Sequence, residues 1–273
     1  MRLEESYLSE RPLHAFVLLE ALNWAFFMLE RNIKTILDTG FFASFLIRFI
    51  LRATVLLLIA PKVLKIPNGQ RTFKQYIEDI KLRQKKPVWR SLKIATYLAV
   101  ILLGALFIAA TLYGGFQWDL SQLDPSKSPI LLVAINAGLW EEIMWRGIIM
   151  TLFLKRYSAR SAVLINTGLF AISHLINLLS GQSIIVMLGQ IVFVLIGTPI
   201  LAYLFIMTES LLPVILLHFA VDAFSPLFIN SMIQPGPDII KGGIYMLLGW
   251  MIGNIVANIV LQWHSGRIKT QPD

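Results

Sequence analysis

Eight stretches of about 20 mostly apolar residues constrain the fold of this chain more than any other feature of its sequence. A helix needs about that many apolar residues to cross the hydrocarbon core of a bilayer. The sequence therefore predicts an all-α, polytopic membrane helix bundle of about eight transmembrane helices, with residues 1–273 forming one membrane domain. The stretches lie near residues 13–30, 41–60, 93–116, 130–154, 161–179, 184–207, 211–231 and 240–262. The first contains Glu20 and is bounded by charge, so a helix lying along the interface is the alternative there.

The composition supports a membrane protein and excludes several other classes. Hydrophobic residues make up 56% of the chain and charged residues 15%, whereas soluble domains are about one quarter charged. The sequence has no cysteine, which excludes disulfides, thiolate metal sites and cysteine nucleophiles. Its net charge of +8 would suggest nucleic acid as the partner of a soluble protein. Here the basic residues cluster beside apolar stretches, which indicates contact with the lipid membrane and not with nucleic acid.

Charge in the loops predicts how the chain is oriented in the cell membrane. The loop at about 61–93 has only Glu78 and Asp79 as acidic residues, and its many basic residues place it in the cytoplasm. The segment 117–129 has two aspartates and one lysine and is expected outside. With eight spans, both termini are then cytoplasmic. The basic residues of the loop are Lys62, Lys65, Arg71, Lys74, Lys81, Arg83, Lys85, Lys86, Arg90 and Lys93. Within it, helical spacing of Phe73, Ile77 and Ile80 predicts an amphipathic helix on the membrane surface.

Ionisable residues inside the apolar stretches are the best guide to function, because each costs about 2.5–3.5 kcal/mol to insert and needs a partner or a wet cavity. Arg48 and Arg52 lie one turn apart, and we expect their long side chains either to reach lipid headgroups or to form structural pairs. Glu20 is expected near an interface. The other six occupy three later stretches near mid-span; they are Glu141, Glu142, Arg146, His174, His218 and Asp222.

The spacing of these residues predicts which of them face one another. Glu142 and Arg146 are four residues apart and can pair on one helix face. Glu141 is rotated by about 100° from Glu142, so one carboxylate can be held by the arginine while the other faces a cavity. His218 and Asp222 also lie four apart, which lets the carboxylate orient or stabilise the imidazole.

The three groups resemble the motifs of the CAAX-protease and bacteriocin-processing (CPBP, or Abi) family, which includes the type II CAAX prenyl endopeptidases. Its motifs are Glu-Glu-x-x-x-Arg, Phe-x-x-x-His and His-x-x-x-Asn or Asp, each on its own membrane helix. Asp222 stands where the CAAX endopeptidases usually have asparagine. The resemblance covers about residues 130–230, and the matching residues are Glu141-Glu142…Arg146, Phe170…His174 and His218…Asp222.

The resemblance implies an intramembrane endopeptidase that acts on a membrane-associated peptide or protein. In this interpretation Glu141, assisted by His174, deprotonates a water molecule, and His218 with Asp222 stabilises the oxyanion. Glu142 and Arg146 would hold their helix in register. Phe170 would shape the cavity beside His174.

A zinc site is the competing interpretation of the same residues. His174, His218 and a carboxylate of Glu141 or Asp222 would make an acceptable catalytic triad of ligands. The sequence lacks the His-Glu-x-x-His pair that delivers two ligands and a base from one helix. A mechanism without metal or other cofactor is therefore the favoured prediction, with zinc as the alternative.

Two other functions remain open at the level of sequence. A non-enzymatic immunity or peptide-binding protein would occupy the membrane in the same way. A proton-coupled transporter would use Glu141, His174 and His218 as a relay, but Gly197-Thr198-Pro199 has no counterpart in a second half of the chain. For the enzyme, each motif lies about 11–13 residues into its helix, so the side chains of Glu141, His174 and His218 should meet near the midplane around one polar cavity.

Overall fold

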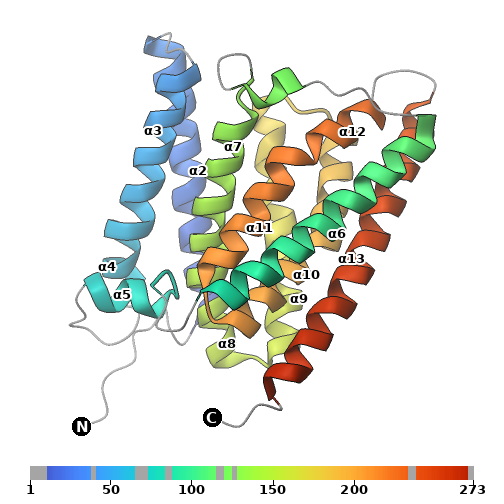
Figure 1. Ribbon diagram of the computed structural model, residues 1–273. Helices are drawn as coiled ribbons and strands as arrows, with labels where there is room; N and C mark the ends of the chain where they lie inside the picture. The colour runs from blue at the N-terminus through green and yellow to red at the C-terminus, as the bar shows by residue number, and fades with distance from the viewer. Residues whose placement is uncertain are drawn as a thin grey trace.

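The computed structural model describes residues 11–37, 41–64, 73–83, 88–114, 120–124, 128–232 and 238–269. Every regular element within these ranges is a helix (Figure 1). Seven helical segments are long and apolar enough to cross a membrane, so the chain is a multi-pass membrane protein, as the sequence predicts. These segments are Pro12–Leu29, Phe42–Lys62, Trp89–Gly114, Ala159–Leu179, Ile184–Thr208, Leu211–Asn230 and Ile239–His264.

The remaining predicted stretch, residues 130–154, is helical throughout but is not one regular α-helix. It begins as α7 (Ile130–Asn136), continues through two π-helical segments, η3 (Ala137–Glu141) and η4 (Ile143–Met150), and ends as α8 (Thr151–Arg156). In a π turn the backbone hydrogen bond spans five residues instead of four, and such turns are frequent at functional sites. The irregular stretch carries Glu141, Glu142 and Arg146, so the departure from α-helix coincides with the charged motif.

Two groups of helices surround the centre of the molecule. On one side, α2 (Pro12–Leu37) runs beside α3 (Phe41–Ala53), which continues as π-helical η1 (Thr54–Ile59) and α4 (Ala60–Leu64) (Figure 1). This hairpin favours a spanning helix over the interfacial alternative for the first apolar stretch. On the other side, α6 (Trp89–Gly114) crosses the bundle obliquely and packs against α11 and α13. The remaining helices are α9 (Ala159–Ser173), followed by the 3₁₀ segment η5 (His174–Ser180), α10 (Ile184–Thr208), α11 (Leu211–Phe224), α12 (Pro226–Met232) and α13 (Ile239–Lys269).

The short helix α5 (Phe73–Asp79) lies where the sequence predicts an amphipathic helix, and its buried face matches the predicted one at Ile80 but not at Phe73. Tyr76 and the following Ile80 are buried, whereas Phe73 is 56% exposed. The Tyr76 hydroxyl donates a hydrogen bond to the Leu56 carbonyl at 2.5 Å, and burial raises the pKa of this hydroxyl. The Lys81 carbonyl accepts from the Leu211 amide at 3.0 Å. Thus α5 packs onto the end of the bundle and joins η1 to the start of α11.

The two loops predicted to lie on opposite sides of the membrane are at opposite ends of the bundle (Figure 1). The start of α2, helix α5, the junction of α8 and α9, and the end of α13 lie at one end. The short 3₁₀ segment η2 (Leu120–Leu123) and the start of α7 lie at the other end. Parts of both loops, residues 65–72, 84–87, 115–119 and 125–127, are outside the described residues. Which end faces the cytoplasm stays a prediction.

Candidate active site

The predicted site residues meet at a cavity of about 500 Å³ in the centre of the bundle. Its walls come from α2, α3, η1, the irregular helix 130–156, α9, α10 and α11, and it is lined by Glu141, His174, His218 and Asp222 together. The structure thus brings residues of all three motifs to the wall of one cavity. Their chemical roles stay predictions.

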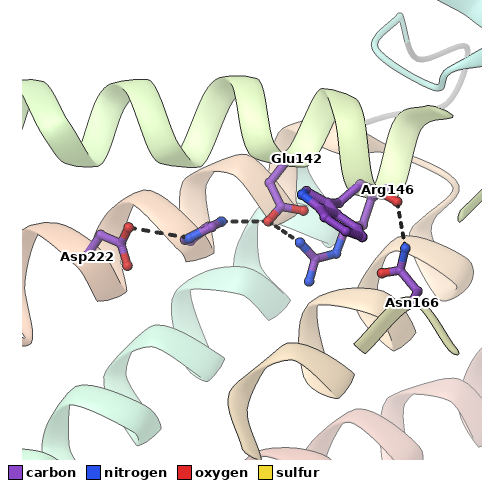
Figure 2. Close-up of polar contacts among 6 residues, drawn as sticks. Glu142, Arg146, Asn166 and Asp222 are labelled. Carbon is purple, nitrogen blue, oxygen red and sulfur yellow. Dashed lines mark hydrogen bonds and ion pairs between the residues drawn. The ribbon is translucent and has the colours of Figure 1, made fainter. Parts of the chain in front are cut away.

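Glu142 lies behind the cavity wall and joins two of the three motifs. Its side chain is fully buried, and its Oε1 atom accepts a hydrogen bond from Arg146 Nη1 at 2.7 Å, which confirms the predicted pair. The same oxygen lies 2.6 Å from Nδ1 of His218, a contact that helical spacing does not predict. Figure 2 shows the resulting row of side chains from Arg146 through Glu142 toward Asp222.

His218 faces a carboxylate with each of its ring nitrogens. Beside the contact with Glu142, its Nε2 lies 3.4 Å from Oδ2 of Asp222, one turn along α11. Carboxylate oxygens only accept hydrogen bonds, so both nitrogens carry a proton in this arrangement and the ring is an imidazolium. The two cations, Arg146 and His218, then balance the two anions, Glu142 and Asp222. This balance is what allows four ionisable groups to lie together in a membrane bundle.

His174 differs from His218, because the structure describes a hydrogen-bond partner for only one of its two ring nitrogens. It lies at the point where α9 changes into η5, and its Nδ1 is 2.8 Å from the Phe170 carbonyl. A carbonyl accepts hydrogen bonds, so Nδ1 carries a proton, and in the neutral tautomer with this proton Nε2 keeps a lone pair. His174 can therefore accept a hydrogen bond from a water molecule in the cavity.

Phe170 packs among the charged and aromatic groups of the site. The Arg146 guanidinium lies over its ring at 5.0 Å from the centroid, a cation–π arrangement. The rings of Trp145 and His174 approach it at 5.0 and 4.9 Å. Phe170 also lines the cavity, as the sequence predicts.

The π-helical segment η3 brings Asn136 to the cavity, which the sequence alone does not predict. In a regular α-helix, Asn136 and Glu141 would point about 140° apart, yet both line the cavity here. Asn136 Oδ1 accepts a hydrogen bond from Arg52 Nη1 at 3.3 Å. Arg48 and Arg52 both line the cavity, and the contact of Arg52 with Asn136 is a structural pair, one of the two alternatives expected for these arginines.

Asn166 is a second polar residue of the site that the motifs do not include. It is fully buried, and its Nδ2 donates to the Trp145 carbonyl at 3.1 Å (Figure 2). The sequence does carry a signal, because Asn166, Phe170 and His174 follow one another at four-residue spacing and so share one face of α9. The hydrogen bond of Asn166 therefore connects α9 to the irregular helix that carries Glu141.

Gly138 explains how α11 comes close enough for His218 to reach Glu142. A Cβ atom at this position would lie 3.0 Å from the Phe219 amide nitrogen and 3.1 Å from the Ile215 carbonyl oxygen. Both are backbone atoms and neither can move without moving α11. Small residues allow this kind of close approach between membrane helices.

The described side chains do not fit the zinc alternative. Within the part of the chain that the structure describes, no three His, Cys, Asp or Glu side chains are grouped closely enough to hold a metal ion. His218 would have to give up Asp222 or Glu142 to become a ligand, since both of its nitrogens face carboxylates. We therefore derive no step that passes through a metal.

Comparison with known families gives one result that bears on this geometry. Residues 125–224, which are 100 of the 273 in the chain, match the family model described as type II CAAX prenyl endopeptidase Rce1-like. No curated protein and no solved structure matches the chain. The matched region contains all three motifs and every site residue from Glu141 to Asp222. Over residues 125–224 the chain is therefore similar to the type II CAAX prenyl endopeptidases, and this similarity indicates an intramembrane protease.

Proposed function

We propose that the protein is an endopeptidase that hydrolyses a peptide bond of a membrane-associated peptide or protein inside the central cavity. One observation carries the proposal: Glu141, His174, His218 and Asp222 come from three helices and line the same cavity of about 500 Å³. Amide hydrolysis needs an activated water molecule and a donor for the oxyanion, and these four side chains supply both.

Glu141 acts as the general base in the proposed reaction. It removes a proton from a water molecule that also donates a hydrogen bond to the free lone pair of His174 Nε2. The water oxygen forms a bond to the carbonyl carbon, and the C=O π electrons move onto the carbonyl oxygen. Glu141 then passes its proton to the leaving nitrogen as the C–N bond breaks. General acid–base catalysis of this kind contributes about 10²–10⁴-fold in rate.

His218 stabilises the oxyanion in the same proposal. Its Nδ1 is held by Glu142 at 2.6 Å, which fixes the orientation of the ring. Its contact with Asp222 is longer, 3.4 Å, so Nε2–H can exchange this weak contact for a hydrogen bond to a developing oxyanion at small cost. Glu142 therefore has a further positioning role, beyond the pairing with Arg146 expected from the sequence.

The proposal also specifies the cofactor requirement of the protein and its location in the cell. The reaction as written uses no metal ion or other cofactor. The protein would lie in the cell membrane with both termini in the cytoplasm and take its substrate from the membrane. The immunity, peptide-binding and transport alternatives gain no specific support from the cavity.

A comparison of cellular peptide termini tests the proposal even though the substrate is not identified. Cells that express the wild type should contain new protein termini that are lost with Glu141→Gln. Glu209→Gln is the matched control, because Glu209 is exposed and pairs with Lys81 away from the cavity. Identical termini with the wild type and Glu141→Gln would contradict the proposal.

A purified assay then separates the mechanism from its alternatives. A peptide that covers an identified cleavage site should be cut by the wild type in the presence of a metal chelator, and about 10²–10⁴-fold more slowly by Glu141→Gln. Loss of activity with the chelator and its recovery with zinc would overturn the metal-free mechanism. Binding of the peptide without cleavage would favour a peptide-binding protein.

A further inference from the structure

Helix α13 lies at one edge of the bundle, where its outer face carries both apolar and amide side chains (Figure 1). The helix packs against α6, α10 and α12. Beside α10, an open groove of about 420 Å³ is lined by Ile196 of α10 and otherwise by residues of α13 alone. The α13 residues that line it are Met251, Asn254, Ile255, Asn258, Ile259 and Gln262.

These residues follow one another along α13 at intervals of three or four positions, which places them on one face of the helix. Met251, Ile255 and Ile259 are 44%, 57% and 62% exposed. Such spacing of apolar residues is the pattern by which one helix packs along a second helix. The amides of Asn254 and Asn258 lie within this apolar face.

Both asparagines keep hydrogen-bonding capacity that the rest of the chain does not use. Asn254 Nδ2 donates to the Trp250 carbonyl at 2.8 Å, and its Oδ1 is buried and accepts from none of the described residues. Asn258 is half-buried, and its Nδ2 donates to the Asn254 carbonyl at 2.9 Å. Among the described residues the structure gives Asn258 no other hydrogen bond, so a second N–H and the Oδ1 atom remain for a partner.

The depth of the two amides makes lipid a poor neighbour for them. Asn254 is near the middle of the apolar segment Ile239–His264, and Asn258 is one turn, about 6 Å, closer to its end. The hydrocarbon core offers no hydrogen-bond partner, and polar residues at this depth almost always face protein or a wet cavity. A protein surface that covers the groove would supply the missing donors and acceptors.

A second copy of this chain is the partner whose chemistry fits best. An asparagine side chain both donates and accepts, so two Asn258 side chains can bond to each other. All copies of a membrane protein cross the bilayer in the same direction, so a twofold axis between two copies stands along the membrane normal. Two α13 helices are then parallel and bring the same residue to the same depth. An asparagine within the apolar seam of a parallel helix pair fixes its register and the number of chains.

We infer that this face of α13 is a dimer interface, at which the Asn258 side chains of two copies bond to each other. Met251, Ile255 and Ile259 pack around the amide pair. The inference goes beyond the proposed function and does not depend on it, because none of these residues lines the central cavity.

Oxidative cross-linking tests the interface, because the chain has no cysteine and each variant then carries a single thiol. A disulfide forms only when the two Cα atoms lie within about 7 Å. Copper phenanthroline should therefore convert Ile255→Cys and Ile259→Cys to disulfide-linked dimers in isolated membranes. Val256→Cys is the matched control: Val256 is 42% exposed beside Ile255 but is rotated by about 100° on the helix. Equal cross-linking of Ile255→Cys and Val256→Cys, or none at either groove position, would overturn the interface.

Energy transfer between labelled copies in liposomes tests the role of the amide. Purified chains labelled at the N-terminus are diluted with lipid to measure the dissociation constant of the dimer. Loss of the amide pair in Asn258→Leu should weaken the dimer about 3–30-fold, and Asn258→Gln should retain part of the affinity. Thr111→Val is the control, because Thr111 is exposed on α6 and its hydroxyl donates to the Phe107 carbonyl of its own helix.

Phospholipid and a helix of another protein are the other occupants of such a groove, and the same liposomes distinguish them. The liposomes contain only lipid and the purified chain, so a dimer of the wild type requires no further protein. Wild-type protein that stays monomeric at every ratio of protein to lipid would assign the groove to lipid or to another protein and overturn the inference. A dimer that is equally stable with Asn258→Leu and Thr111→Val would overturn it as well.

Discussion

Glu142 is fully buried, and a single oxygen of its carboxylate accepts from both Arg146 and His218. A carboxylate removed from water to this extent is stable only when cations face it, because desolvation costs several kcal/mol per ion. Removal of its charge would leave Arg146 buried without its partner. Glu141, in contrast, is partly exposed in the cavity wall.

Glu142→Gln should therefore destabilise the protein far more than Glu141→Gln, by about 3–5 kcal/mol in the free energy of unfolding. Reversible unfolding in mixed detergent micelles measures both variants against the wild type. The adjacent Glu141→Gln substitution changes the same chemical group and serves as the control. Equal stability of the two variants would show that the Arg146–Glu142–His218 contacts contribute little to folding.

For single residues, the sequence predicts contacts between side chains that are close in the chain, but not contacts between side chains that are far apart in it. Glu142–Arg146 and His218–Asp222 follow from helical spacing alone, and both are present. The Glu142–His218 contact joins residues 76 positions apart, and nothing in the sequence records that separation in space. For Arg52 the sequence leaves headgroup contact and structural pairing open, and it does not identify the partner Asn136, which lies 84 positions away.

Among the elements, the irregular helix 130–156 and α11 form the contact on which the site depends most. Their backbones approach at Gly138, four residues before Glu142, and the α11 atom nearest to a Cβ there belongs to Phe219, the neighbour of His218. Any shift of α11 at this point also moves His218 relative to Glu142.

Gly138→Ala should separate these two helices and weaken the site. Over-packing of this kind costs about 1–3 kcal/mol, and we expect a loss of peptide cleavage larger than the loss of stability would explain. Gly104→Ala in α6 is the control, because a Cβ atom there meets nothing within 4 Å. Measurements of the cleavage rate and of the free energy of unfolding of both variants test this prediction. Full activity of Gly138→Ala would mean that α11 adjusts without moving His218.

The helical elements themselves could be predicted from the sequence, because apolar length is a strong signal in a membrane protein. All eight predicted stretches correspond to helical segments. The π-helical segments could not, since an apolar stretch in a bilayer has no polar face whose period would reveal a change of turn. The burial of Tyr76 in α5 could not be predicted either, because Tyr76 packs through tertiary contacts that residue spacing does not encode.

For the molecule as a whole, the distribution of basic residues predicts which end of the helix bundle faces the cytoplasm. Lys81, Arg90 and Arg156 belong to the same end of the bundle as α5, and short loops rich in Lys and Arg remain in the cytoplasm. Reporter fusions after residues 83 and 273 should both report the cytoplasm, and a fusion after residue 123 the exterior. If the fusion after residue 83 reports the exterior, the chain has the opposite orientation in the membrane to the predicted one.

The contact between Glu142 and His218 also has a consequence for biosynthesis. A ribosome adds about 5–20 residues per second, so the 76 positions between them take about 4–15 s to synthesise. During that interval Arg146 can neutralise Glu142, but the cavity lacks both His218 and Asp222. In the proposed mechanism, a nascent chain, or one truncated before Leu211, would have the general base without the group that binds the oxyanion. If the proposed mechanism holds, proteolytic competence would arrive only with α11, so stalled translation products would remain inert in the membrane.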